Sequence, residues 1–82
     1  MNKKNINIQE NFNLGLQNFK KNNLKDAENF FNEVLSNNPN HLESIFFLGI
    51  LQAKKKDFNK AKDFFIKVIK IDKFGLFQKT KV

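Results

Sequence analysis

The sequence predicts an all-α protein built from two consecutive helical hairpins, and three observations lead to this fold class. A shift of 34 residues aligns much of the 82-residue chain with itself. Only three glycines and one proline interrupt the chain, which favours long helices over a turn-rich β-protein. Apolar residues in each copy recur at the spacing of a helix face. We therefore expect a single domain over residues 1–82, with repeats at about 8–41 and 42–75 and a tail over 73–82.

The two copies agree in one register without a gap. Their identical pairs are Leu14/Leu48, Gly15/Gly49, Lys20/Lys54, Lys21/Lys55, Ala27/Ala61, Phe30/Phe64, Phe31/Phe65 and Val34/Val68. Phe12/Phe46 is a further identical pair, and conservative pairs such as Leu16/Ile50 lie between them. Coincidence would not place so many matches in one register, so the 34-residue unit is a structural repeat.

The first repeat is expected to contain helices at about 8–21 and 25–37, separated by Asn22-Asn23. The first helix carries one apolar stripe, which consists of Ile8, Phe12, Leu16 and Phe19. The second helix is amphipathic, with its apolar residues on one face and polar residues opposite, as in surface helices. Asn38-Pro39-Asn40 ends it, because proline lacks an N–H and disfavours helical geometry in the residue before it.

The second repeat is expected to contain helices at about 41–55 and 59–72. Asn40 is the expected N-cap of the first of these, with Glu43 three residues on completing a pair like a capping box. That helix is apolar on nearly all sides through Ile45-Phe46-Phe47-Leu48, so it should be buried on most sides. The last helix repeats the amphipathic pattern of the second helix of the chain.

This pattern resembles the tetratricopeptide repeat family over about residues 8–75. The family's 34-residue unit has a Leu-Gly in its first helix, an Ala early in its second, a large aromatic four residues later and a closing Pro. The matching residues are Leu14, Gly15, Ala27, Phe31 and Pro39 in the first copy, and Leu48, Gly49, Ala61 and Phe65 in the second. Lys73 stands where the second closing proline would be. Each glycine is expected to face the alanine of its own repeat where the two helices cross.

The resemblance implies that the first helices of the two repeats line a concave groove that binds another polypeptide. The expected groove residues are Phe12, Leu16, Phe19, Phe46, Ile50 and Ala53. Because these spacings are apolar, the family's basic clamp for a partner's C-terminal carboxylate is missing, and that peptide class is not an expected ligand. Two occupants stay open: a different protein, or the chain's own ends or a second copy of the chain in a homo-oligomer.

A lysine-rich edge is the second candidate feature. This basic rim consists of Lys20, Lys21, Lys54, Lys55 and Lys56, in equivalent turns of the two repeats. It either attracts an acidic partner or simply solvates the turns. The net charge of +7 also suggests low-specificity binding of polyanions such as RNA. The chain has no arginine, however, which is the preferred side chain for phosphate and base contacts, so nucleic acid is the least favoured ligand.

No set of residues predicts catalysis, a cofactor or a metal site. The chain has no cysteine, and its one histidine, His41, is expected beside a helix start. Ser36 and Ser44 have no activating His or Cys, and the three glycines are isolated rather than forming a phosphate loop. No apolar run is long enough to span a membrane, and no signal peptide is evident. We expect a non-enzymatic cytoplasmic protein that needs no cofactor and contacts no membrane.

The end of the chain carries the last expectation. Ile66 and Ile71 stand where the second helix has Asn32 and Asn37, so the outermost helix is the more apolar one. Repeat arrays usually need a capping element at such an end. The apolar tail residues that could supply it, by packing on the last helix or on another chain, are Phe74, Leu76 and Phe77.

Overall fold

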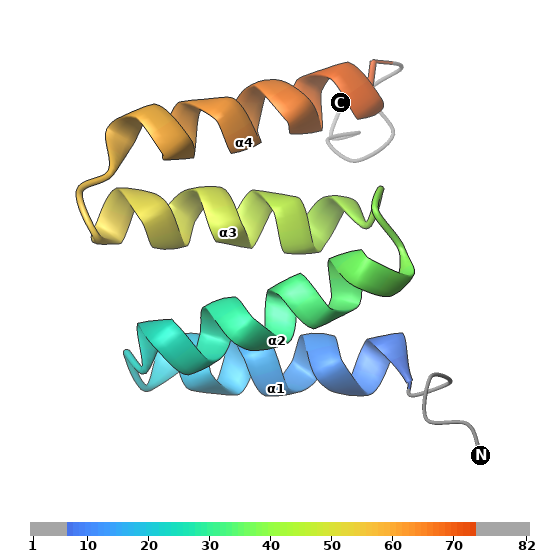
Figure 1. The fold of residues 1–82 in the computed structure, drawn as a ribbon, viewed down its shortest axis with the longest axis vertical. Helices are drawn as coiled ribbons and strands as arrows, with labels where there is room; N and C mark the ends of the chain where they lie inside the picture. Colours follow the sequence, from blue (N-terminus) through green and yellow to red (C-terminus); the bar gives the residue numbers. More distant parts are fainter. Residues whose placement is uncertain (1–6, 74–82) are drawn as a thin grey trace, which may run out of the picture.

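A computed structural model describes residues 7–73 and contains four helices over this span: α1 (Ile8–Lys20), α2 (Leu24–Asn37), α3 (Leu42–Lys54) and α4 (Phe58–Ile71). Each boundary lies within one residue of the prediction, and the all-α fold class is confirmed. Helices α1 and α2 form one antiparallel hairpin and α3 and α4 the other, with α3 lying between α2 and α4 (Figure 1). The expected capping by Phe74, Leu76 and Phe77 concerns residues outside the described part of the chain.

Side chains at the starts of α1, α3 and α4 satisfy backbone N–H groups that have no partner within the helix. Asn7 caps α1 and Asp57 caps α4, each accepting a hydrogen bond from the N–H of the third helical residue, at 3.1 and 3.2 Å. The prediction that Asn40 caps α3 is wrong. Because α3 begins one residue later than predicted, His41 occupies the cap position, and its Nδ1 accepts a hydrogen bond from the N–H of Ser44 at 3.3 Å.

The turns inside the two hairpins are built alike. Asn22 and Lys56 hold equivalent places in the two copies, and both have a φ of 67°. Asparagine tolerates this left-handed conformation, whereas it is strained for lysine. The equal geometry despite different residues shows that the hairpin packing, rather than the turn residue, determines the shape of the turn.

Close approach of the two helices in each hairpin depends on a glycine. A Cβ placed on Gly15 would lie 2.6 Å from a ring carbon of Phe31, and one on Gly49 would lie 2.7 Å from a ring carbon of Phe65. The expectation that each glycine faces the alanine of its repeat is therefore wrong. The atoms nearest to that Cβ belong to the phenylalanine four residues after the alanine, which is Phe31 in the first repeat and Phe65 in the second.

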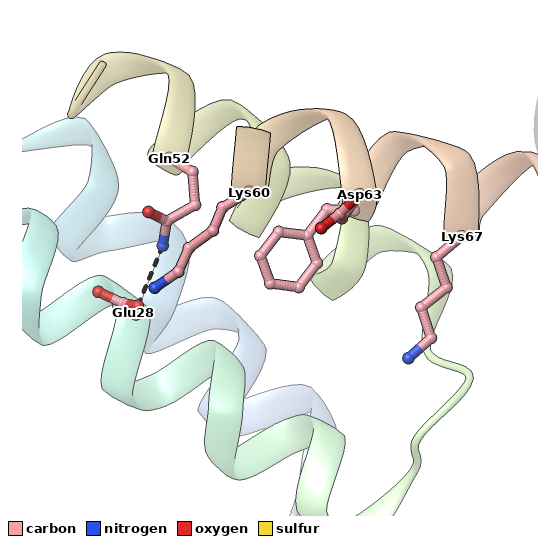
Figure 2. Close-up of a pocket in the computed structure, with 6 residues that line it drawn as sticks. Glu28, Gln52, Lys60, Asp63 and Lys67 are labelled. Atoms are coloured by element: carbon pink, nitrogen blue, oxygen red, sulfur yellow. Dashed lines mark hydrogen bonds between the residues drawn. The ribbon is translucent and has the colours of Figure 1, made fainter. Parts of the chain in front are cut away.

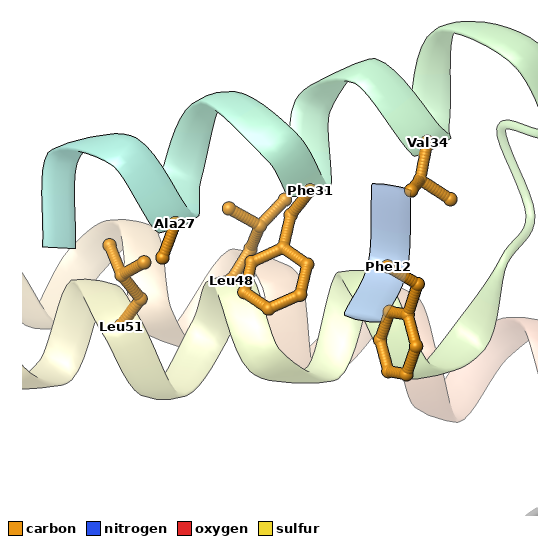
Figure 3. Packing of buried hydrophobic residues seen from close by; sticks show 6 residues of the cluster. All are labelled: Phe12, Ala27, Phe31, Val34, Leu48 and Leu51. Atoms are coloured by element: carbon orange, nitrogen blue, oxygen red, sulfur yellow. The ribbon is translucent and has the colours of Figure 1, made fainter. Parts of the chain in front are cut away.

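The core lies where α3 meets the first hairpin. Its buried cluster draws on three helices and consists of Phe12, Ala27, Phe31, Val34, Leu48 and Leu51 (Figure 3). Helix α3 contributes the most deeply buried side chains of the second repeat, since Ile45, Leu48 and Leu51 are at most 1% exposed. This burial accounts for the nearly continuous apolar surface of α3, which must contact the first hairpin on one side and α4 on the other.

The two glycines give a matched test of this packing. Gly15→Ala should lower the free energy of unfolding by about 1–2 kcal/mol, because Phe31 is fully buried and its ring has no space to move. Gly49→Ala should change it by less than about 0.5 kcal/mol, because half-buried Phe65 can shift and alanine has the better helix propensity. Urea unfolding followed by circular dichroism measures both, and equal effects would contradict the assignment of the tight crossing.

Candidate protein-binding surface

Phe47 of α3 joins the second repeat to the first. Its ring centroid lies 6.0 Å from that of Phe12 and 5.7 Å from that of Phe19, both on α1. On α2, the ring of Phe31 stacks on it at 5.9 Å with an interplanar angle of 15°. One side chain therefore fixes α3 against both helices of the first hairpin, and this brings the first helices of the two repeats together at one surface.

A polar contact ties the same helices together at the other end of α3. The Nε2 of Gln52 donates a hydrogen bond to Oε2 of Glu28 on α2 at 3.1 Å (Figure 2). The ammonium of Lys55 donates to the other carboxylate oxygen, Oε1, also at 3.1 Å. Gln52 is only 2% exposed, so its amide needs this acceptor. The contact fixes the register of α3 on α2.

Five of the six expected groove residues reach the surface of the first helices. Leu16, Phe19, Phe46, Ile50 and Ala53 are half-buried, and we call these five residues the α1–α3 face. Phe19 and Phe46 both contact the ring of Phe47 at 5.7 Å, so the contributions of the two repeats are joined through one residue. A half-buried apolar side chain on a rigid helix can lose its remaining exposed area on binding with little loss of conformational freedom.

The placement of Phe12 in the groove is wrong. Phe12 is 9% exposed and belongs to the core. Its ring is covered by residues of the second repeat and of the segment that leads into α3. The ring of His41 lies 5.2 Å from it and that of Phe47 6.0 Å. From the sequence alone Phe12 and Phe46 are equivalent, yet within residues 7–73 only Phe12 has a following repeat packed on it.

The five lysines of the basic rim do not act alike. The ammonium of Lys54 lies 5.6 Å from the centroid of the Phe19 ring, which places it on the α1–α3 face as a cation–π contact between the repeats. Lys55 is instead held by Glu28 and belongs to the contact between α2 and α3. The side chains of Lys20, Lys21 and Lys56 are exposed. Lys55 is therefore not part of the expected basic rim, because it forms an ion pair with Glu28.

A pocket of about 320 Å³ opens on a different surface, among α2, α3 and α4. It is lined by Glu28, Gln52, Lys60, Asp63, Phe64 and Lys67 (Figure 2). Two lysines balance two carboxylates there, and both oxygens of the Glu28 carboxylate already accept hydrogen bonds. The carboxylate of Glu28 is therefore engaged in the contact between α2 and α3.

Phe47 and Gln52 were not predicted from the sequence as individual contact residues. Phe47 was hidden in a run that is apolar on all sides, where periodicity cannot tell one contact from another. Gln52 did carry a signal, since it is a lone polar residue one position after the buried Leu51 and before Ala53. Its buried position required a partner, and the only candidates were residues on neighbouring helices.

Residues 7–73 carry neither a metal-binding cluster nor a membrane-spanning helix. No group of three or more histidine, cysteine, aspartate or glutamate side chains in this span is arranged to hold a metal ion. None of the four helices is both long enough and apolar enough to cross a membrane.

The stacked antiparallel hairpins, with α3 packed on both helices of the preceding pair, define a helical-repeat protein. Comparison with family models matches the tetratricopeptide repeat twice, at residues 11–41 and 42–74. Because the two matches span more than half of the chain, the protein belongs to the tetratricopeptide repeat family. Comparisons with curated proteins and with solved structures gave no match. Tetratricopeptide repeats generally mediate protein–protein interactions and are typically non-enzymatic scaffolds.

The polar contact between the repeats can be tested at Glu28. Glu28→Ala should lower the free energy of unfolding by about 1–3 kcal/mol, because it leaves the buried amide of Gln52 without its acceptor. Glu28→Gln keeps an acceptor oxygen and should cost less than the alanine variant. Lys55→Ala should cost at most about 1 kcal/mol, since that lysine is largely exposed.

Urea unfolding of the three variants gives the comparison, and Lys21→Ala is the matched control because Lys21 is the exposed equivalent of Lys55 in the first repeat. A Glu28→Ala variant as stable as the parent chain would show that the contact does not hold α3 in place.

Proposed function

We propose that the chain is an adaptor that binds a segment of another protein across the α1–α3 face. The observation that carries the proposal is the composition of this face: five apolar, half-buried side chains from the first helices of the two repeats, which the family resemblance implies line a binding groove. Contiguous apolar surface of this kind on a soluble domain usually marks a contact site.

Rigidity of the surface supports the same proposal. Phe19 and Phe46 are both held against Phe47, and Phe46 also contacts Phe65 of α4 at 5.9 Å. Aromatic side chains fixed before binding lose little entropy when a partner covers them. They are also among the side chains that dominate binding energy at protein interfaces.

Charge suggests the chemistry of the partner segment. Lys54 lies over Phe19 at the edge of the α1–α3 face, and the neighbouring Lys20 is exposed. The whole chain carries a net charge of +7. A ligand with apolar side chains for the face and an acidic residue near Lys54 would satisfy both features, with the charge acting mainly on the rate and specificity of association.

The test uses peptides selected from a random displayed library for binding to the full chain. Ala53→Arg should weaken the selected peptides at least tenfold, roughly the loss expected when a bulky charge enters an apolar interface. Lys54→Glu should shift selection away from acidic sequences. Ile69→Ala on α4, outside the α1–α3 face, is the matched control and should leave affinity unchanged.

Selected peptides that ignore Ala53→Arg would contradict the proposal. A parent chain that self-associates, and that Ala53→Arg converts to a monomer, would assign the face to a homo-oligomer. Binding to RNA with a steep, linear dependence of log affinity on log salt concentration would instead indicate a polyanion ligand.

A further inference from the structure

Helix α4 exposes a second apolar surface, separate from the α1–α3 face. Three large side chains on it are solvent-accessible: Phe58 at 65%, Ile69 at 64% and Ile66 at 41%. We call these three residues the α4 end face. In the first repeat, Leu24 and Leu35 hold the places of Phe58 and Ile69, and both are partly buried against the core.

The difference between the two helices has one cause. Helix α3 packs on α2, whereas no helix in the described part of the chain packs on the equivalent side of α4. The arrangement of α2 and α3 therefore serves as a template for what the α4 end face can accept: a helix with an apolar face that lies against its neighbour as α3 does.

We propose that the α4 end face binds an amphipathic helix of another protein, one that carries an acidic residue opposite Lys62. The charge follows from the template. In the first repeat Glu28 of α2 meets Lys55 of α3 at 3.1 Å. The residue of α4 equivalent to Glu28 is Lys62, which is exposed. A helix that packs on α4 in the same way must therefore carry an acidic residue at the position that Lys55 occupies in α3.

A second copy of the chain does not fit this site. Head-to-tail stacking would place α1 of the next copy on α4, in the role of α3. The positions equivalent to Ile45, Phe47 and Leu51 of α3 are Asn11, Asn13 and Gln17 in α1. Such stacking would bury these amides against apolar side chains without hydrogen-bond partners, which is costly.

Symmetric contact between two α4 helices is opposed by charge. Lys62 and Lys70 are both exposed beside the apolar residues of the end face, so pairing two copies would bring like charges together. An acidic partner helix is attracted by the same lysines.

The tail of the chain is the remaining occupant, since Phe74, Leu76 and Phe77 were expected to pack on this helix. Continuing the repeat register, however, places Lys79 and Lys81 at the positions equivalent to Ile45 and Phe47. A tail packed in that register would put two ammonium groups where α3 has its contact residues. This register favours a partner helix over the tail.

The probe is a synthetic peptide of residues 41–56, the α3 segment, in which Lys55 is replaced by Glu. It should bind the full chain and shift the NMR resonances of Phe58 and Ile69, whose equivalents in the first repeat are Leu24 and Leu35. The unmodified α3 peptide should bind roughly 2- to 5-fold more weakly, the range measured for single exposed ion pairs. Lys62→Glu in the chain should reverse this preference.

Two variants of the chain act as matched controls. Ile69→Asp should abolish binding of the peptide without unfolding the protein, because Ile69 is 64% exposed. Ala53→Arg, on the α1–α3 face, should leave binding of the peptide unchanged, so failure here and failure of the proposed adaptor function are distinguishable.

Four results would overturn the proposal. The first is that neither peptide binds. The second is that binding survives Ile69→Asp, because the peptide would then be displacing α3 from α2 instead of binding to α4. Alternatively, NMR contacts in the free chain join Ile69 to Phe74 or Leu76, so the tail covers the face. Finally, sedimentation shows a dimer that Ile69→Asp dissociates, so a second copy covers it.

Discussion

The packing of Phe47 against the first hairpin is the contact on which the rest of the structure depends. Its ring meets Phe12 and Phe19 of α1 and Phe31 of α2 at centroid distances of 5.7–6.0 Å. A single hairpin of this size has too little interior to bury its own apolar face, so the second must cover the first. In the first copy, the residue equivalent to Phe47 is Asn13, which is exposed, and α1 packs on no earlier helix within the described residues 7–73.

Packing within a hairpin and packing between hairpins share one side chain. The ring of Phe31 lies over Gly15, where even a Cβ would come within 2.6 Å of it, and the same ring stacks on Phe47. The glycine therefore does more than let two helices cross. It lets Phe31 sit deep enough in the hairpin to form the surface that α3 covers. Phe65 lies over Gly49 in the same way but is only half-buried, since within residues 7–73 no further helix packs on α4 as α3 packs on α2.

The sequence predicted the helices and the repeat well because both depend on local patterns that occur twice. The predictions from sequence were wrong where contacts with other helices determine the burial or the partner of a side chain. Phe12 of α1 and Phe46 of α3 are equivalent in the repeat pattern, yet Phe12 is buried, where α3 covers α1, and Phe46 is only half-buried. Lys55 appeared to belong to the basic rim, but Glu28, 27 residues earlier, holds it. The facing residue of Gly15 was misplaced by one helical turn, because the pattern gives the spacing along a helix and not the position of a ring across it.

If Phe47 couples the two hairpins, its loss must weaken the whole domain and not only α3. The direct measurement is the free energy of unfolding of Phe47→Leu beside that of Phe46→Leu, the adjacent phenylalanine on the same helix. Phe47→Leu should lose about 1–2 kcal/mol, because three ring contacts to the first hairpin disappear, and Phe46→Leu clearly less. Equal losses, or a Phe47→Leu variant as stable as the parent chain, would contradict the central role of this residue.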